Sequence, residues 1–229
     1  WLSDGSFANA MVAKSAGAWM RGIVRAGVMG LKGTEHTVIP ASIGAVTYMA
    51  GAARAGEGVT LSRVNREDLK AVTEAIVKSG HTVTFNEAGD SCFIERGENP
   101  VGVDLKTAPY PGYPTDMQAQ MTALLATTPG LSVVKDTIFP QRFMHCAELK
   151  RMGADIKVDH GSAIVRGVAQ LSAAPVMASD LRASAALVLA ALRAKGSTEI
   201  SRLYHIDRGY ENIDEKLLTL GAAVERVRV

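Results

Sequence analysis

The sequence is poor in cysteine, in aromatic residues and in long hydrophobic runs. Its two cysteines, Cys92 and Cys146, match no metal or redox spacing. Free thiols are typical of a reducing compartment, so we expect a cytoplasmic protein. The longest apolar run, residues 183–192, is too short to cross a bilayer, which predicts no membrane partner. The 25 Lys and Arg residues are balanced by 23 Asp and Glu, so no basic surface for nucleic acid is expected.

Several catalytic and cofactor motifs are also missing. The sequence has no Walker loop, no GxGxxG fingerprint and no paired Cys/His ligand set, which argues against nucleotide triphosphate hydrolysis, Rossmann redox chemistry and structural zinc. His145 and Cys146 are adjacent, so we expect no easy Cys–His pair and no thiol nucleophile. With 229 residues, 47% of them hydrophobic, the chain can nevertheless bury a substantial core.

A repeated order of elements organises the chain. Glycines that end helices recur in two matching sets: Gly58, Gly130 and Gly196, then Gly80, Gly153 and Gly221. The period of about seventy residues is too long for a solenoid and predicts β-α-β-α-β-β modules. We place three of them in one domain of residues 40–229, at about 40–105, 106–172 and 173–229. Residues 1–39 are predicted to be a partial tail of a preceding module, a linker or a terminal cap, with only weak helical spacing at Phe7, Met11 and Val12.

Within this frame, apolar periodicity, caps and breakers locate individual elements. The expected helices cover residues 43–54, 68–78 with Asp68 as a possible N-cap, 117–126, 145–152, 181–194 and 213–220. The expected strands cover residues 38–39, 59–64, 82–85, 131–134, 156–158, 163–165, 199–201 and 224–227.

Charged residues gather where the first helix of a module begins. Asp180 stands at the N-cap of the helix at 181–194 with Arg182 in its first turn, and Asp116 opens the corresponding helix of the preceding module. The alternative is a simple cap and a surface charge. If the modules pack around a common axis, these helix N-termini converge on one face. Such a face fits a substrate with phosphate or carboxylate groups and one proton to be moved.

The sequence allows two roles for each of two further arginines. Arg208, directly before Gly209, could bind a phosphate with both arms of its guanidinium, or could be tied to Asp207 or Glu211. Arg142 is either a charge at the edge of the core or a contact for an anion.

Four segments carry a family resemblance. Residues 114–120 (PTDMQAQ), 142–145 (RFMH), 180–184 (DLRAS) and 204–211 (YHIDRGYE) resemble the UDP-N-acetylglucosamine enolpyruvyl transferase (MurA) family, over about residues 22–229. The resemblance implies an α/β fold, the inverse α/β prism of the enolpyruvyl transferases. It also implies UDP-N-acetylglucosamine and phosphoenolpyruvate as substrates, in the first committed step of peptidoglycan synthesis, with no metal or cofactor.

The resemblance also implies roles for seven residues. Catalytic roles fall to Asp116, the general base at the sugar 3-hydroxyl, to Asp180, and to Arg208, which clamps phosphoenolpyruvate. Substrate-binding roles fall to Ile138, Arg142, Leu181 and Arg182.

Departures from the family pattern keep alternatives open. Family members are about twice as long, and their first domain supplies a Lys and a mobile Cys loop without counterparts here. We therefore expect this chain to be the second-domain half, which needs the missing first domain as a partner and is inactive alone. Residues 41–46 read ASIGAV where the family has Asp-Arg-Ile-Glu-Thr-Gly. That change favours the alternative of a non-catalytic prism-fold binding or regulatory relative. An EPSP synthase-type enzyme is the remaining alternative.

Overall fold

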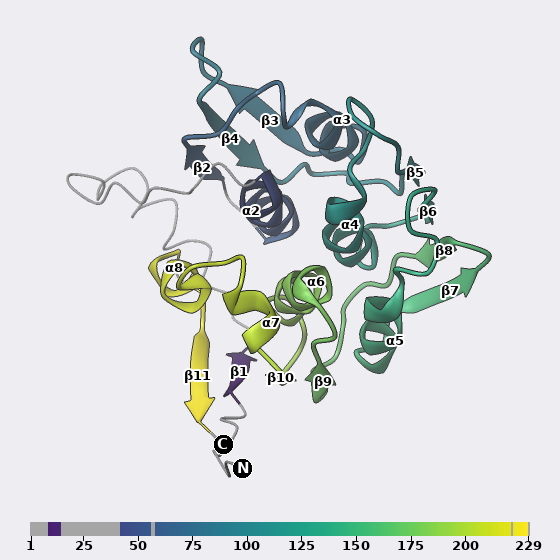
Figure 1. Cartoon of the computed structure of the whole chain (residues 1–229), viewed down its shortest axis with the longest axis vertical. Coiled ribbons are helices and arrows are strands. Elements are labelled where there is room, and N and C mark those ends of the chain that lie inside the picture. The colour runs from purple at the N-terminus through teal and green to yellow at the C-terminus, as the bar shows by residue number, and fades with distance from the viewer. Residues whose placement is uncertain (1–8, 15–41, 56–57, 221, 229) are drawn as a thin grey trace, which may run out of the picture.

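Three central helices form the middle of the molecule. The computed structural model describes residues 9–14, 42–55, 58–220 and 222–228. Helices α2 (Ser42–Ala55), α4 (Gln118–Leu125) and α6 (Leu181–Ala191) lie side by side, and the sheets and remaining helices surround them (Figure 1). Each of the three is the first helix of one expected module, so the modules do pack around a common axis.

The second module has the complete predicted order of elements. Its strands are β5 (Leu105–Lys106), β6 (Leu131–Lys135), β7 (Asp155–Asp159) and β8 (Ser162–Arg166). They form a sheet in the order β5-β6-β8-β7, in which β5 is parallel to β6 and the other pairs are antiparallel. Helices α4 and α5 (Met144–Arg151) make the two crossovers. The β-α-β-α-β-β prediction is confirmed for this module.

The third module takes one strand from the other end of the chain. Its own elements are β9 (Val176–Met177), α6, β10 (Ser197–Ser201), α7 (Tyr204–Asp207), α8 (Ile213–Thr219) and β11 (Val224–Arg228). Strand β1 (Asn9–Lys14) lies antiparallel between β10 and β11, where β8 lies in the second module. The weak helical spacing at Met11 and Val12 was therefore misleading, because these residues are extended. Phe7 lies outside the described residues.

The first module has the same arrangement in its described part. After α2 come β2 (Val59–Ser62), α3 (Lys70–Lys78), β3 (Thr82–Phe85) and β4 (Ser91–Glu95), with the sheet order β2-β4-β3. The sequence did not predict β4, and the strand expected at 38–39 lies outside the described residues. The expected cap by Asp68 is wrong: Leu69 precedes α3, and no side chain caps it.

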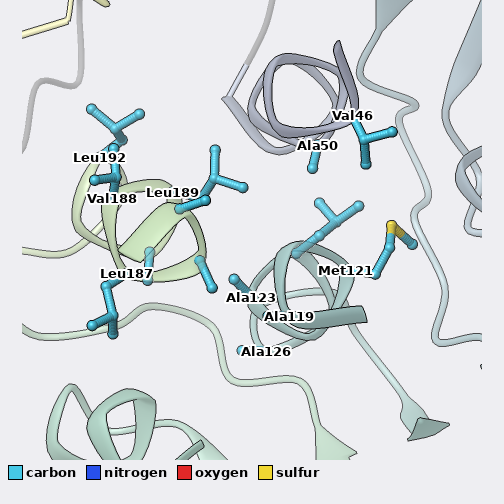
Figure 2. Packing of buried hydrophobic residues seen from close by; sticks show 14 of the residues in the cluster. Val46, Ala50, Ala119, Met121, Ala123, Ala126, Leu187, Val188, Leu189 and Leu192 are labelled. Atoms are coloured by element: carbon cyan, nitrogen blue, oxygen red, sulfur yellow. The ribbon is translucent and has the colours of Figure 1, made fainter. Parts of the chain in front are cut away.

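Alanine-rich helices allow the three modules to meet closely. All eight residues of α4 are buried, and in α6 every residue from Ala183 to Ala191 is buried. Figure 2 shows Val46 and Ala50 of α2, Met121 of α4 and Leu189 of α6 among the side chains between these helices. A helix that is apolar on all sides belongs inside a protein. No helix in the described ranges is long and apolar enough to cross a membrane.

Candidate active site

The carboxylate of Asp116 is held between two arginines from different modules. Asp116 lies in the short 3-10 helix η1 (Thr115–Met117), which leads into α4 from the extended residue Pro114. Its Oδ1 accepts hydrogen bonds from Nη1 of Arg142 at 2.9 Å and from Nε of Arg182 at 2.5 Å. Arg142 belongs to the same module and Arg182 to the first turn of α6. The clamp therefore joins the helix starts of the second and third modules.

The clamp faces solvent and has a net positive charge. The side chains of Asp116, Arg142 and Arg182 are 37%, 23% and 26% exposed. Two guanidinium groups against one carboxylate leave a formal charge of +1, and the N-terminal end of α6 adds a positive dipole. Water screens part of this charge, yet all three groups remain within reach of a bound molecule. The arrangement can attract an anion and can accept one proton at Asp116.

Arg142 is fixed by further contacts. Its guanidinium lies over the ring of Phe139, 3.9 Å from the ring centroid. A longer hydrogen bond of 3.3 Å joins its Nη1 to Oγ1 of Thr115. These contacts hold a partly exposed guanidinium in one orientation, and both interpretations of Arg142, a charge at the core edge or a contact for an anion, stay predictions.

Asp180 caps α6, as the sequence suggested. Its Oδ1 accepts from the backbone amides of Arg182 at 2.9 Å and Ala183 at 3.1 Å. The hydroxyl of Ser179 donates to Oδ2 at 3.2 Å. Asp180 is thus an N-cap, and its expected catalytic role stays a prediction. The alternative of a simple surface charge is wrong for Arg182, because Arg182 pairs with Asp116.

Asp136 is a structural carboxylate that the sequence analysis missed. It is buried directly after β6 and accepts from Oγ1 of Thr107 at 2.8 Å, from Oγ1 of Thr115 at 2.6 Å and from the amides of Ile138 and Phe139. Burial alone would raise its pKa, but these four hydrogen bonds hold the pKa below its ordinary value. One sequence pattern could have indicated this role: an Asp at the end of a strand can accept hydrogen bonds from the backbone amides two and three residues later.

Asp136 connects two parts of the site. One of its oxygens holds Thr115, the neighbour of Asp116, and the other orients the turn that carries Ile138 and Phe139. Ile138 is exposed on this turn, so its predicted role in binding the sugar nucleotide stays a prediction.

Arg208 is near the helix start but does not join the clamp. A Cβ built on the neighbouring residue Gly209 would lie 2.9 Å from Cδ2 of Leu181, so this segment packs on the first residue of α6. Arg208 itself is exposed at the end of α7 and forms no hydrogen bond or ion pair among the described residues. The alternative that ties it to Asp207 is wrong, because both carboxylate oxygens of Asp207 bond to Arg226.

The tie to Glu211 is likewise absent, since Glu211 lies 4.0 Å from Nζ of Lys216. The structure thus brings Asp116, Arg142 and Arg182 into direct contact and places Asp180 and Leu181 beside them. The guanidinium of Arg208 engages none of the residues that the structure describes.

His145 and Cys146 are closer than the sequence suggested. Nε2 of His145 lies 3.6 Å from Sγ of Cys146, so the expectation that these neighbours would not pair is wrong. Both side chains are buried. Burial raises the pKa of Cys146 to about 12 and lowers that of His145 to about 4, with the nearby Asp180 opposing the second shift. The pair consists of a thiol and a neutral imidazole, which supplies no thiolate nucleophile.

A buried polar network fixes the three modules behind the clamp. The hydroxyl of Tyr210 lies 2.6 Å from Oγ1 of Thr47, and Nε2 of Gln120 donates to the same oxygen at 3.4 Å. These residues come from the third, first and second modules. No group of three or more His, Cys, Asp or Glu among the described residues is placed to hold a metal ion.

Solved structures share this fold. The crystal structure of the enolpyruvyl transferase NikO from Streptomyces tendae matches with a TM-score of 0.70 at 23% identity, covering 82% of this chain and 44% of that one. An EPSP synthase from Acinetobacter baumannii matches with a TM-score of 0.66 at 18% identity, covering 82% and 47%. At these identities the likeness concerns the fold, and it confirms the predicted enolpyruvyl transferase architecture.

Curated relatives are similar over nearly the whole chain. A UDP-N-acetylglucosamine 1-carboxyvinyltransferase of Akkermansia muciniphila is 67% identical over 97% of this chain and 52% of its own length. An enzyme of the same name from Desulfatibacillum aliphaticivorans is 49% identical over 96% of this chain and 52% of its own length. The chain spans about half the length of the curated relatives it matches.

A protein-family model gives the assignment. The model described as EPSP synthase (3-phosphoshikimate 1-carboxyvinyltransferase) matches residues 10–217, which include the clamp, the cap of α6 and the segment of Arg208. The chain therefore belongs to the EPSP synthase (3-phosphoshikimate 1-carboxyvinyltransferase) family, and curated relatives similar to it are UDP-N-acetylglucosamine 1-carboxyvinyltransferases.

Proposed function

We propose that this chain is one half of a UDP-N-acetylglucosamine 1-carboxyvinyltransferase. In the complete enzyme, the 3-hydroxyl of the sugar adds to C2 of phosphoenolpyruvate, and phosphate then leaves to give an enolpyruvyl ether. The relatives named for this reaction support the proposal. The observation that carries it is the clamp, in which one carboxylate is held by two arginines at the converging starts of α4 and α6.

The clamp suggests how the base becomes available. While both guanidinium groups bond to Oδ1, that oxygen is occupied and cannot also accept a hydrogen bond from the sugar hydroxyl. A phosphate or carboxylate on the substrate competes for the same guanidinium groups. It can bind an arginine through two parallel hydrogen bonds, whereas Asp116 receives one from each. Arg142 and Arg182 then turn toward the anion, and Asp116 is free to accept the proton of the sugar hydroxyl. Substrate binding thus activates the base.

The proton and the leaving group are accounted for in this scheme. The sugar oxygen forms a bond to C2 while its proton passes to Asp116, and C3 gains a proton. In the second half of the reaction C3 loses a proton and the bond between C2 and the phosphate oxygen breaks. We assign the proton donor at C3 to the other half of the enzyme. Arg208, exposed and without a partner among the described residues, is the third cation for the departing phosphate.

The two substrates also suggest the setting. Nucleotide sugars and phosphoenolpyruvate are cytoplasmic metabolites, so we place the complete enzyme in the cytoplasm, at the start of peptidoglycan synthesis. Its partner is a first domain that closes over the clamp and excludes water from it.

A chimera tests the proposal. This chain is fused to the first half of the Akkermansia muciniphila relative in place of that enzyme's own second half, and phosphate release is measured with both substrates. We expect turnover by the chimera and none by the chain alone. Asp116→Asn in the chimera should lower kcat by about 10²–10⁴-fold, the usual contribution of a general base. The KM for the sugar should change little. Arg151→Gln, on the exposed end of α5, serves as a control that should leave turnover unchanged.

The second candidate is a prism-fold module that binds without catalysis, favoured by the altered segment 41–46. A folded but inactive chimera would support it. So would calorimetry in which the chimera binds the sugar nucleotide equally well with and without Asp116→Asn, while phosphoenolpyruvate is never consumed.

A further inference from the structure

A basic cavity lies at the opposite end of the central helices from the clamp. It has a volume of about 270 Å³, and its lining includes Arg54, His81, Arg96 and Arg193. Arg54 is in the last turn of α2, and Arg193 follows the end of α6. The 11 residues of α6 separate this end from the clamp by about 16 Å, at a rise of about 1.5 Å per residue. The cavity is therefore separate from the candidate active site.

Arg54 is a buried cation without a counter-ion among the described residues. It is 5% exposed, and its Nη1 donates to the carbonyl of Ala123 at 2.6 Å. Its Nε and Nη2 have no hydrogen-bond partner in the part of the chain that the structure describes. Burial, followed by the charges of Arg193 and Arg96, lowers the pKa of Arg54 to about 9. A buried charge is normally paired, so an unpaired one next to a cavity calls for an anion.

His81 adds a neutral donor at the same place. Its Nδ1 accepts from the amide of Gly97 at 3.3 Å, so the proton of the neutral ring lies on Nε2. Nε2 is buried and has no hydrogen-bond partner within the described ranges. Burial and the charge of Arg96 lower the pKa of His81 to about 4, which keeps the ring neutral at pH 7. Together, Arg54 and His81 leave three donor nitrogens unused and supply no free acceptor.

Helix dipoles do not neutralise the cavity. The C-terminal ends of α2, α4 and α6 face it, and each contributes about −0.5 charge, about −1.5 in total. Three arginines contribute +3, and no carboxylate of the described residues lines the cavity. An excess of about +1.5 remains by this count. The helix dipoles can balance the charge of one or two arginines at this end of the helices. They cannot balance the charge of all three.

We propose that this cavity is a binding site for a small phosphate-bearing anion. The exposed guanidinium groups of Arg96 and Arg193 supply the direct hydrogen bonds, because neither forms one with the described residues. Arg54 supplies an unscreened positive charge from beneath. The cavity is large enough for a phosphate group with several waters. Since Arg54, Arg96 and Arg193 belong to or follow α2, β4 and α6, the anion connects the first and third modules and stabilises their contact.

Thermal unfolding of the full chain in inorganic phosphate and in pyrophosphate, at constant ionic strength with NaCl, tests the proposal. We expect a saturable rise in Tm of about 3–5 °C at ten times the Kd. Pyrophosphate should bind more tightly than phosphate because it carries more charge. Equilibrium dialysis with labelled phosphate gives the Kd independently.

Variants locate the site. Arg54→Met should weaken binding at least tenfold and, without phosphate, should melt no lower than the parent chain, because an unpaired buried charge is removed. Arg193→Gln and Arg96→Gln should each weaken phosphate binding about fivefold. Because both positions are exposed, these two variants test the proposal even if Arg54→Met does not fold. Arg151→Gln is the matched surface control and should bind normally.

The clamp could also bind phosphate, so Arg142→Gln is needed as well. The rise in Tm should survive Arg142→Gln if the cavity is the site. A phosphate effect that disappears with Arg142→Gln and persists in Arg54→Met or Arg193→Gln would overturn the proposal. Failure of this test would leave the transferase proposal untouched, because that proposal rests on the clamp and the named relatives and not on the cavity.

Discussion

Acid should destabilise the fold through His145. This ring is fully buried against Phe143 and Cys146, and burial lowers its pKa from 6.5 to about 4 despite the nearby Asp180. The unfolded chain therefore binds a proton at a pH where the folded chain does not. The stability that the neutral ring contributes is fully present above pH 6.5 and is lost as the pH falls toward 4. Between pH 7 and pH 5 the loss amounts to about 2 kcal/mol, at about 1.4 kcal/mol per pKa unit.

Urea unfolding followed by far-ultraviolet circular dichroism at pH 7, 6 and 5 measures this loss. The parent chain is compared with His145→Leu, which cannot titrate, and with His160→Gln as a control. The side chain of His160 is 95% exposed, so this variant removes a histidine without disturbing the core. The carboxylates and His81 titrate in all three chains, so the difference between their slopes isolates His145. Only the change in the free energy of unfolding with pH is compared between the chains, so a different overall stability of His145→Leu does not affect the result.

We expect the pH dependence of His145→Leu to be shallower by about 2 kcal/mol over this range, and the removal of the surface histidine not to reproduce this change. If His145→Leu keeps the full slope, the imidazole is not held neutral by burial. A slope that flattens equally in His160→Gln would show that surface histidines, not this buried one, account for the effect.

Three further changes test other parts of the structure by urea unfolding. Asp180→Ala removes the side-chain cap of α6 and should cost about 1 kcal/mol, whereas an unchanged midpoint would mean that the cap bonds add nothing. Asp136→Ala leaves four donors without their acceptor and should cost about 3 kcal/mol or more at pH 7. That difference should shrink in strong acid, because the lowered pKa of Asp136 gives stability that is lost as the pH falls through it. In Gly167→Ala the new Cβ would lie 1.7 Å from the carbonyl oxygen of Thr128, so the cost should exceed about 3 kcal/mol. Gly153→Ala meets no atom within 4 Å and should cost only about 1 kcal/mol for its positive φ of 89°; equal losses in the two variants would contradict the close approach.

Local patterns predicted much of the fold because each module repeats the same signals. Apolar spacing and a terminal glycine placed α4, α5 and α6 within a few residues of their observed bounds. The same reasoning failed for β1, because a strand that pairs with β10 and β11 is determined by partners about 180 to 220 residues away. No local rule contains that information. Tertiary pairing overrode a weak helical spacing at Met11 and Val12.

The site was predictable only in part. Asp116, Asp180 and Arg182 were found because acids and arginines at helix starts are visible in sequence. That Arg182 reaches Asp116 across two modules depended on the packing of α6 against α4. Asp136 was missed because its role depends on four donors, of which Thr107 and Thr115 lie far away along the chain.

The alanine-rich contact between α4 and α6 determines the geometry of the clamp. Asp116 and Arg182 stand at the starts of these two helices, and their bond is 2.5 Å long. A shift of one helix along the other by a single residue, about 1.5 Å, would break that bond. Ala123 of α4 and Ala186 of α6 are completely buried, so larger side chains there would push the helices apart. The small residues in the core therefore position the clamp as well as stabilise the fold, because they hold a carboxylate and an arginine from separate modules at bonding distance.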